Sequence, residues 1–365
     1  MRRLFPVLPG RCHFPEGRPP QSLYPAAQTA ALGQPMEFKN ALVTGGGGFL
    51  GKAVVKKLLE KNLTVFSFSR HFYKDLEEMG VAQIQGDLSD AASVTAAFKN
   101  MDAVFHVAAK PGIWGEYQDY FRVNVTGTEN VIAACFQNQV KQLIYTSSPS
   151  VIFDENDMEN VDESVPYPET YLAPYPETKA LAEKRVRAAA EKGLKTIIIR
   201  PHLIWGPGDN HLVPGILKRA GRLKRVGRKD DLVDTIYVDN AADAHVWAWE
   251  KLAANPSLSG NVYFVSQDEP VSKWDMANAF LAAAGLPPIR GSVSAKTAYR
   301  AGAVFETLYR LFRIQKEPPM TRFAAKELAT SHWFNISRAK KDLGYYPRIS
   351  TQEGLARLKE DLSRI

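Results

Sequence analysis

The chain has 365 residues, 45% of them hydrophobic and 23% charged, a composition typical of a soluble globular protein with a full core. Its net charge of +7 is unevenly placed, because residues 1–36 hold four arginines against one glutamate. The surplus of four positive charges that remains is too small to indicate nucleic-acid binding. Two cysteines without a C-x-x-C pair exclude a disulfide framework and a cysteine-based zinc site, and they favour a reducing, cytoplasmic setting.

Residues 1–36 contain seven prolines and show no periodic apolar pattern, which predicts a disordered extension. Prolines and arginines interrupt its hydrophobic stretches, so the segment is a poor secretory signal. No apolar run in the sequence is long enough to span a membrane. Met36 stands just before the first expected strand, so a mis-assigned start codon and a targeting role are both open interpretations.

Residues 40–51 are typical of a phosphate-binding turn. An apolar run at 41–43 predicts a strand, four glycines predict a tight turn, and residues 52–59 predict an amphipathic helix. Glycines bring backbone N–H groups close to a pyrophosphate, whose charge the start of a helix favours. The spacing fits both G-x-G-x-x-G and T-G-x-x-G-x-x-G. With Tyr175 and Lys179 downstream, the T-G-x-x-G-x-x-G spacing is preferred, and its principal positions are Gly45, Gly48 and Gly51.

Short apolar segments alternate with amphipathic ones from residue 64 to residue 199. This alternation predicts an α/β fold with a parallel, doubly wound sheet of the Rossmann type. The expected strands are 64–68, 83–85, 103–107, 143–146 and 196–199, and the expected helices are 93–98, 117–137 and 175–192.

The alternation loosens after Arg200, where the pattern predicts strands at 232–237 and 262–266 and helices at 274–284, 298–312, 321–329 and 337–343. We expect a dinucleotide-binding Rossmann domain over residues 37–200. Residues 201–365 should form mainly a smaller substrate-binding lobe, with strand 262–266 returning to the Rossmann sheet.

The most informative segment is Tyr175-Pro-Glu-Thr-Lys179, since positions i and i+4 of a helix share one face. An ammonium ~4 Å from a phenol contributes ~4 kcal/mol at an effective dielectric near 20, which lowers the phenol pKa by up to ~3 units before desolvation opposes it. Such a tyrosine can exchange a proton with a carbonyl oxygen. Because this spacing also occurs by chance on solvated helices, Tyr167-Pro-Glu-Thr-Tyr171 is a useful internal control, which lacks the lysine and should be inert.

Ser147 and Ser148 follow the strand expected at 143–146. Ligands of open α/β sheets bind beyond the carboxyl ends of the strands, so a serine there can hydrogen-bond the oxygen that Tyr175 protonates. A turn or cap serine is the alternative. The order of glycine turn, strand-end serine and Tyr-x-x-x-Lys favours a single site.

Several further motifs accompany the glycine turn and the Tyr-x-x-x-Lys segment. Together the motifs are Thr44-Gly45-x-x-Gly48-x-x-Gly51, Gly86-Asp87-Leu88, His106-Val-Ala-Ala109, Asn124-Val-x-Gly127-Thr128, Tyr145-Thr-Ser-Ser148, Tyr175-x-x-x-Lys179 and Arg200-Pro201. With them the chain resembles the extended short-chain dehydrogenase/reductases over residues 37 to about 360. Within that family it is similar to the 3-beta-hydroxysteroid dehydrogenase branch, and segments 105–114, 200–209 and 318–323 resemble bacterial 2-alkyl-3-oxoalkanoate reductases, the ketoreductases of long-chain olefin biosynthesis.

The resemblance implies catalytic roles for three residues. Tyr175 is the proton donor in reduction, Lys179 lowers its pKa and holds the nicotinamide ribose, and Ser148 orients the substrate carbonyl. Ser147 is the weaker candidate, because Ser148 makes the family's Ser-x-x-Val spacing with Val151. The resemblance also implies cofactor contacts by Phe49, Leu50, Asp87, Leu88, Ala108, Ala109 and Asn124.

The end of the second strand bears on the choice of cofactor. A carboxylate there would bind a ribose 2′-hydroxyl and repel a 2′-phosphate, but residues 66–71 contain none. Ser69 can hydrogen-bond a phosphate and Arg70 can pair with it, so NADPH is favoured over NADH. A solvated surface role for Arg70 is the alternative.

The substrate site is less defined by the sequence. His106, Lys110 and His202 are expected on loops facing the nicotinamide end, although a structural role is the alternative for each. Residues 298–312 carry an apolar stripe with arginines nearby, which suits a core-facing helix, a wall for alkyl chains or a helix resting on an acidic lipid surface.

We expect an NADPH-dependent oxidoreductase that reduces the 3-keto group of a long-chain 2-alkyl-3-oxoalkanoate. The alternatives are a hydroxysteroid or sterol dehydrogenase and a non-catalytic NADP-binding redox sensor. The expected partner is a small-molecule acyl substrate rather than nucleic acid. Peripheral membrane contact, a homodimer and association with other enzymes of the same pathway stay open.

Overall fold

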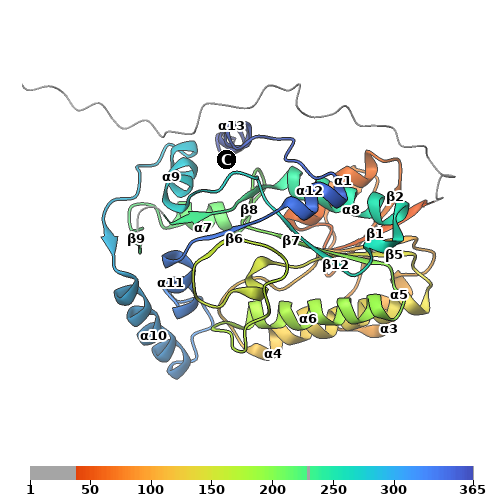
Figure 1. Ribbon diagram of the computed structural model, residues 1–365, viewed down its shortest axis with the longest axis horizontal. Coiled ribbons are helices and arrows are strands. Elements are labelled where there is room, and N and C mark those ends of the chain that lie inside the picture. Colours follow the sequence, from red (N-terminus) through yellow and green to blue (C-terminus); the bar gives the residue numbers. More distant parts are fainter. Residues whose placement is uncertain (1–37, 228–230, 365) are drawn as a thin grey trace, which may run out of the picture. The chain divides into compact units, whose positions relative to one another are not determined.

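The computed structural model describes residues 38–227 and 231–364, so the predicted disorder of residues 1–36 lies outside the described residues. A seven-stranded parallel sheet in the order β12-β7-β5-β4-β1-β2-β3 forms its centre (Figure 1). Its strands are β1 (Asn40–Thr44), β2 (Thr64–Ser69), β3 (Ala82–Gln85), β4 (Ala103–His106), β5 (Gln142–Thr146), β7 (Thr196–Pro201) and β12 (Asn261–Val265).

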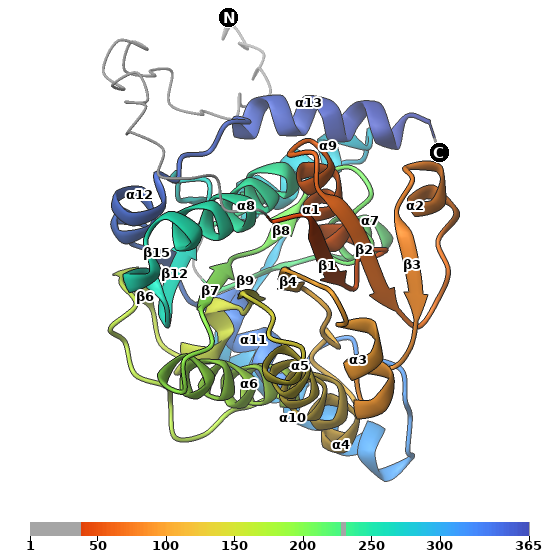
Figure 2. The ribbon, with the colours of Figure 1, turned by 90° about the vertical axis from the view of Figure 1, so that its right-hand side faces the viewer.

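Both faces of the sheet are buried, as its apolar strands require. Successive side chains point to opposite faces, so Val43 and Phe105 pack on one side while Leu42 and Val104 pack on the other. Figures 1 and 2 show helices covering the two faces in separate layers. One layer contains α1 (Phe49–Leu59) and α8 (Val238–Ala254), and the other contains α3 (Ala91–Ala97), α5 (Gly127–Gln137) and α6 (Pro174–Glu191).

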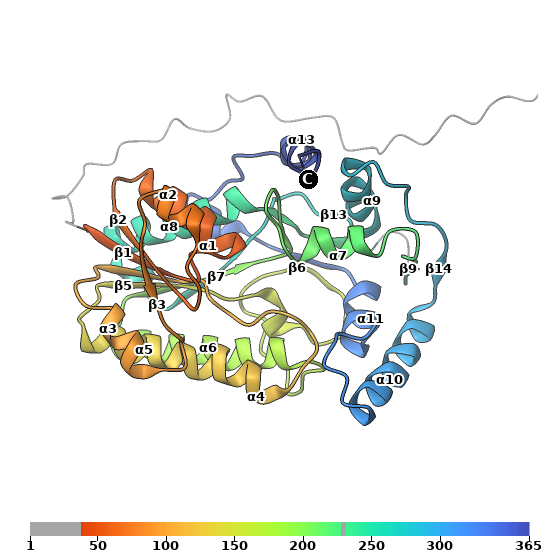
Figure 3. The ribbon, with the colours of Figure 1, turned by 180° about the vertical axis from the view of Figure 1, so that it is seen from behind.

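A smaller mixed sheet in the order β13-β10-β15-β6 belongs to the second lobe, which also contains the two-stranded pairs β11-β8 and β14-β9. Figure 3 shows α10 and α11 at the outer edge of this lobe. Its strands are β6 (Met158–Val161), β8 (Ile204–Trp205), β9 (Arg225–Val226), β10 (Leu232–Val233), β11 (Ile236–Tyr237), β13 (Val271–Ser272), β14 (Ser292–Val293) and β15 (His332–Phe334), and its helices are α7 (Leu212–Lys218), α9 (Lys273–Ala283), α10 (Ala295–Leu311) and α11 (Arg322–Ala329).

The sequence pattern missed several elements. The helix α8 follows directly on β11, and its small alanines and buried polar residues hide the amphipathic pattern. Short α2 (Lys74–Glu78) and the terminal α13 (Thr351–Leu362) were not expected either, whereas α12 (Ser337–Leu343) was. The prediction of a single strand at 232–237 was wrong. The segment contains two strands, β10 and β11, which belong to different sheets.

The helix expected at 117–137 is divided into α4 (Tyr117–Tyr120), a π-helical segment (Phe121–Thr126) and α5. The strand expected at 262–266 corresponds to β12, which pairs with β7 at the edge of the large sheet. The division of function between residues 37–200 and 201–365 stays a prediction.

Candidate active site

The glycine turn joins β1 to α1 at the centre of the large sheet, between β4 and β2. Gly45 has φ +71°, which favours glycine, and its N–H donates to the Phe68 carbonyl at 2.8 Å. A Cβ on Gly51 would lie 2.1 Å from the Gly45 carbonyl oxygen, and one on Gly48 would lie 3.2 Å from it. Backbone therefore approaches backbone closely at the three positions that the sequence favoured.

The start of α1 suits a dinucleotide pyrophosphate. No side chain caps the helix at Gly48, and no acidic residue lies in its first turn, which contains Phe49, Leu50 and Gly51. The first N–H groups of a helix have no intrahelical partner, so here they can bind an anion. Ala108 closes the other side of the turn, because its N–H donates to Thr44 Oγ1 at 3.2 Å and its Cα lies 3.0 Å from a Cβ built on Gly45.

Tyr175 lies in the first turn of α6, whose Pro174 occupies an N-terminal position that tolerates proline. Ser148 follows β5 and caps a 3₁₀ turn, Pro149–Ile152, by accepting from the Ser150 N–H at 3.2 Å. The Ser148 hydroxyl faces Tyr175 and lowers the pKa of its phenol. The structure thus brings the predicted serine and tyrosine together at the carboxyl end of β5.

Ser147 is oriented differently from Ser148. Its hydroxyl donates to Glu183, which also receives Arg200 Nε at 3.0 Å and the Tyr167 hydroxyl at 2.7 Å. Glu183 and Arg200 are almost completely buried. Ser147 is therefore part of a buried network that fixes α6 against β7, and Tyr167, the internal control, belongs to the same network. Glu183 escaped the sequence analysis, although it lies four residues after Lys179 on the same helix.

Lys179 extends from α6 beneath the end of β5. Its ammonium donates to the Thr146 carbonyl at 2.6 Å and lies 4.3 Å from the centre of the Tyr145 ring. Burial lowers the pKa of Lys179 to about 7, while the Glu183 carboxylate opposes part of that effect. The lysine is consequently a buried cation that titrates near neutral pH.

The expected lowering of the Tyr175 pKa is wrong in this structure. Burial raises the pKa of Tyr175 to about 12, and the hydrogen bond with Ser148 offsets only part of that rise. Lys179 directs its charge at the Thr146 carbonyl, so desolvation outweighs the attraction estimated from helix spacing. Tyr175 is therefore a neutral phenol across the physiological range, with a proton to donate.

Asn124 lies in the π-helical segment and is buried. Its amide oxygen accepts from the Lys110 N–H at 2.7 Å, and its amide nitrogen donates to the Lys110 carbonyl at 3.2 Å and to Thr178 Oγ1 at 3.1 Å. Thr178 in turn donates to the Tyr175 carbonyl at 3.1 Å. The π turn, a feature often found at functional sites, thus links the loop after β4 to the start of α6.

The carboxyl ends of β2 and β3 bring Arg70 near Asp87, because Ser69 pairs with Gln85 and the Gly86 N–H donates to the Ser69 carbonyl at 3.1 Å. The N–H and hydroxyl of Ser89 bind the Asp87 carboxylate and lower its pKa, with smaller contributions from Arg122 and Arg70. Ser69 donates its hydroxyl to the His71 carbonyl at 2.9 Å, so Arg70 is the better anchor for a phosphate. Sequence reasoning missed Arg122, since it lies on a helix far along the chain.

Leu88 packs under the same region, and its carbonyl accepts from Asn130 Nδ2 at 2.8 Å. Ala109 lies in the loop after β4, between Ala108 and Lys110, and is partly buried. Apart from Asn124, Tyr175 and Lys179, which lie on helices, the predicted cofactor residues lie at or just beyond the carboxyl ends of β1, β2, β3 and β4, where a dinucleotide lies along a Rossmann sheet.

His106 was expected on a loop facing the substrate, but it is the last residue of β4 and is buried. Its ring nitrogens bond Thr44 Oγ1 at 2.7 Å and Thr128 Oγ1 at 3.1 Å, and burial lowers its pKa to about 3. His202 is also buried, with its ring 5.4 Å from that of His332. Lys110 pairs with Asp119 at 3.1 Å. His106 and His202 are thus neutral packing residues.

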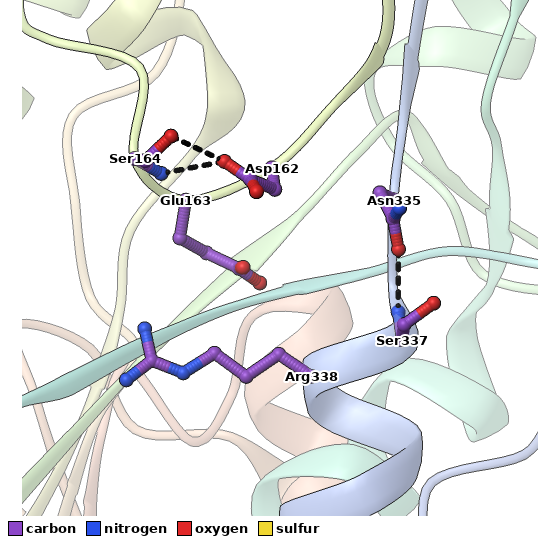
Figure 4. Close-up of a pocket in the computed structure, with 6 residues that line it drawn as sticks. All are labelled: Asp162, Glu163, Ser164, Asn335, Ser337 and Arg338. Atoms are coloured by element: carbon purple, nitrogen blue, oxygen red, sulfur yellow. Dashed lines mark hydrogen bonds between the residues drawn. The ribbon is translucent and has the colours of Figure 1, made fainter.

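A hollow of about 320 Å³ lies between the loop after β6 and the start of α12 (Figure 4). None of the predicted site residues lines it. Its polar groups are engaged locally: Glu163 accepts from the Phe264 N–H, Asp162 from Ser164, and Arg338 donates to Asn261. The hollow is therefore separate from the predicted chemistry.

Residues 42–291 match the model of the 3-beta hydroxysteroid dehydrogenase/isomerase family. The chain is 48% identical to a 2-alkyl-3-oxoalkanoate reductase of Shewanella oneidensis, over 93% of this chain and 91% of the relative. It is 49% identical to a protein of the same name from Stenotrophomonas maltophilia, over 87% of this chain and 98% of the relative. Among solved structures, gox2253 is 27% identical with a TM-score of 0.73, covering 89% of this chain and 98% of that chain.

The fold and these relatives define an oxidoreductase of the extended short-chain dehydrogenase/reductase class. Within that class, the chain belongs to the 3-beta hydroxysteroid dehydrogenase/isomerase family.

Proposed function

We propose that the protein is an NADPH-dependent ketoreductase that converts a long-chain 2-alkyl-3-oxoalkanoate to the 3-hydroxy acid. The observation that carries the proposal is the placement of Tyr175, Lys179 and Ser148 around the carboxyl end of β5, where Lys179 donates to the Thr146 carbonyl and the Ser148 hydroxyl lowers the pKa of the neutral Tyr175. The two relatives of that name at 48% and 49% identity support the substrate class.

In this proposal Ser148 and Tyr175 both bind the 3-keto oxygen. Tyr175 donates its phenolic proton to that oxygen, and Ser148 holds the carbonyl in line with it. The positive charge of Lys179 stabilises the negative charge that develops on the oxygen and on the phenolate, and it can hold the nicotinamide ribose. Bound NADPH supplies the hydride.

The residues present fit a nicotinamide dinucleotide. The uncapped start of α1 and the close backbone approach at Gly51 suit the pyrophosphate. Asp87 and Leu88 would flank the adenine, and Ala108, Ala109 and Asn124 the middle of the cofactor. Arg70 would give the site its preference for a 2′-phosphate, because it directly follows β2, the position at which a carboxylate would bind the 2′-hydroxyl in an NAD-dependent enzyme.

Tyr175→Phe tests the catalytic assignment. Loss of the proton donor should lower kcat by about a hundredfold or more, while NADPH binding stays within a few-fold of the parent. Steady-state rates and a fluorescence titration with NADPH measure the two quantities. Tyr167→Phe is the matched control and should keep its turnover. Unchanged turnover in Tyr175→Phe would remove the residue from the mechanism.

The substrate class is tested in the oxidative direction with NADP, comparing branched long-chain 3-hydroxy acids with 3-beta-hydroxysteroids. We expect turnover of the branched acids. Turnover of steroids alone would replace the substrate assignment with the hydroxysteroid alternative, and NADP binding without turnover of either would favour the redox-sensor alternative.

Arg70→Asp tests the cofactor assignment. A carboxylate at this position should repel the 2′-phosphate and accept the 2′-hydroxyl, so the ratio of kcat/KM for NADPH over NADH should fall by about tenfold or more. Arg185→Asp, on the outer side of α6, is the control for a surface charge change. An unchanged ratio in Arg70→Asp would show that Arg70 does not select the cofactor.

A further inference from the structure

Helix α10 turns an apolar stripe away from the rest of the fold. Val304 is 58% exposed, Leu308 42%, Leu311 71% and Phe312 68%, and Ile314 just beyond the helix is 39% exposed. The first four recur at the i, i+4, i+7, i+8 spacing of one helix face. A wall for alkyl chains would need these side chains to point inward, so the exposure favours an external contact.

The opposite face fixes this orientation. A Cβ on Gly302 would lie 2.6 Å from the backbone of Thr321, so α10 packs closely against the start of α11. Glu306 is buried and accepts from the Arg322 N–H at 2.6 Å and from Arg322 Nε at 2.8 Å. Rotation of α10 would break these bonds. The packing of α10 against α11 therefore holds the apolar stripe toward the solvent.

Cations predominate around the stripe, and the carboxylate that follows them, Glu317, is paired with Arg219 at 3.4 Å. From residue 295 to residue 316 the chain carries five cations, Lys296, Arg300, Arg310, Arg313 and Lys316, which are all exposed. Glu306 is the only acidic residue in that segment, and its carboxylate is turned inward against Arg322. Exposed apolar side chains rimmed by cations form an amphipathic face that complements an anionic surface.

The face is connected to the active-site side of the molecule. Trp114, in the loop after β4, donates its indole N–H to the Ile314 carbonyl at 3.2 Å and packs edge-on against Tyr309. Tyr120 donates its hydroxyl to the Trp114 carbonyl at 3.0 Å. The same loop contains Lys110, which Asn124 binds. Figure 3 shows α10 at the outer edge of the second lobe.

We propose that the apolar stripe of α10, with the cations around it, rests on an anionic lipid surface, so that the enzyme is a peripheral membrane protein. Among the described residues no helix is long and apolar enough to cross a membrane, so the contact would lie in the interface. A symmetric pairing of two copies through this face would bring like cations together without exposed carboxylates on the segment to neutralise them. Lipid headgroups of opposite charge remove that repulsion.

Vesicle flotation of the full chain tests the proposal, with vesicles of phosphatidylcholine alone and of equal parts phosphatidylcholine and phosphatidylglycerol. Binding should be confined to the anionic vesicles and should weaken as salt is raised. The measurement uses neither substrate nor cofactor, so its result is independent of the proposed reaction.

Two groups of variants separate apolar from electrostatic contributions. One triple variant combines Leu308→Ser, Leu311→Ser and Phe312→Ser. Its partition coefficient between vesicle and water should be lower by at least about tenfold, because the inserted apolar area is lost. Arg300→Gln with Arg313→Gln and Lys316→Gln should lower it by roughly a hundredfold, since each cation near an anionic surface contributes a factor of about five. The control for the apolar variant combines Phe136→Ser with Leu286→Ser. The control for the charge variant combines Lys74→Gln, Lys192→Gln and Lys195→Gln.

Control variants should bind as the parent does. Because residues 1–36 are identical in all of these proteins, their arginines do not account for a difference between a variant and its control. Absence of binding to anionic vesicles, or equal losses in variants and controls, would overturn the proposal. A dimer in light scattering that only the apolar variant dissociates, without vesicle binding, would assign the face to a second copy instead. Thermal unfolding and circular dichroism establish that each variant is folded.

Discussion

Ser147 and Ser148 are adjacent in the chain but have different surroundings. The Ser147 hydroxyl is directed at the Glu183 carboxylate within a buried network, whereas Ser148 bonds Ser150 and lowers the pKa of Tyr175. The resemblance to the family, through its Ser-x-x-Val spacing, favoured Ser148, and the hydrogen bond of Ser147 supplies a physical reason. A hydroxyl already bound to a buried carboxylate has no proton left for a substrate. The single-residue offset therefore separates a packing serine from a candidate catalytic serine.

Lys179 should determine the alkaline limb of the pH profile. Burial lowers its pKa to about 7, so the lysine carries its charge below that pH and loses it above. Because the cation stabilises charge on the reacting oxygen in the proposed mechanism, the rate of ketone reduction should fall as pH rises through about 7. The dependence of kcat/KM on pH measures this limb.

Lys179→Arg provides the control for that ionisation, because arginine stays charged across the accessible range. Its reduction rate should be lower than that of the parent, since the fork of a guanidinium fits the Thr146 carbonyl less well, but the limb near neutral pH should vanish. A limb that persists unchanged in this variant would belong to another group.

At the scale of elements, the βα turn shows how a close approach outweighs helix propensity. Gly51→Ala places a methyl group 2.1 Å from the Gly45 carbonyl oxygen unless the turn opens. Alanine ordinarily stabilises a helix interior by about 0.5–1 kcal/mol relative to glycine, but here we expect a loss of about 1–3 kcal/mol and weaker NADPH binding. Urea unfolding and a fluorescence titration measure the two effects.

Gly215→Ala in α7 is the matched control, because a Cβ there would meet only Arg219 Nη1 at 3.6 Å. That variant should be as stable as the parent or more so. If Gly51→Ala behaved in the same way, the tight βα turn would not be needed to bind the cofactor.

The first half of the fold was predictable because most strands there are short apolar runs that a single sheet buries on both faces; the edge strand β3, with the sequence Ala-Gln-Ile-Gln, is the exception. Beyond residue 200 the pattern was less informative. The pattern predicted one strand over Leu232–Tyr237, but Asp234 and Thr235 separate two strands that belong to different sheets. That division depends on the partner strands β15 and β8. The π turn at Phe121–Thr126 has no local signal either. Such features follow from tertiary contacts, which a one-dimensional pattern does not contain.

The sequence named candidate residues for the site, but it did not predict their electrostatics. Helix spacing places Tyr175 and Lys179 on one face, but their pKa values depend on depth and on the Thr146 carbonyl. His106 followed a strand-end motif, although its hydrogen bonds to Thr44 and Thr128 make it a packing residue. Burial, which the sequence gives only indirectly, decides both cases.

At the scale of the whole molecule, the second lobe and the large sheet meet around Asp234. This carboxylate follows β10 and accepts from the Phe334 N–H of β15 at 2.8 Å. The Ser266 hydroxyl, just after β12, offsets part of the rise in its pKa. Nearby, the Tyr345 hydroxyl donates to the Ser266 carbonyl at 2.8 Å. The junction between the two sheets is therefore built from polar groups withdrawn from water.

Asp234 should make the junction sensitive to pH. Burial raises its pKa to about 7, so the folded protein retains a proton that the unfolded chain releases near pH 4. The folded state binds more protons between these values, and its free energy of unfolding therefore falls as pH rises from about 4 to about 7, by up to about 4 kcal/mol. Asp234→Asn removes this ionisation. Urea unfolding should show the variant to be more stable than the parent at about pH 8, with a smaller difference at about pH 5.

Asp90→Asn is the control, because Asp90 is an exposed cap of α3 and asparagine caps a helix equally well. Its stability should follow that of the parent at both pH values. If Asp234→Asn were destabilised equally at the two pH values, the Asp234 carboxylate would be ionised in the folded protein. In that case the Phe334 N–H and Ser266 would interact with an ionised Asp234 carboxylate. The charge-assisted hydrogen bonds between the two sheets would then strengthen, rather than weaken, as the pH rises from about 4.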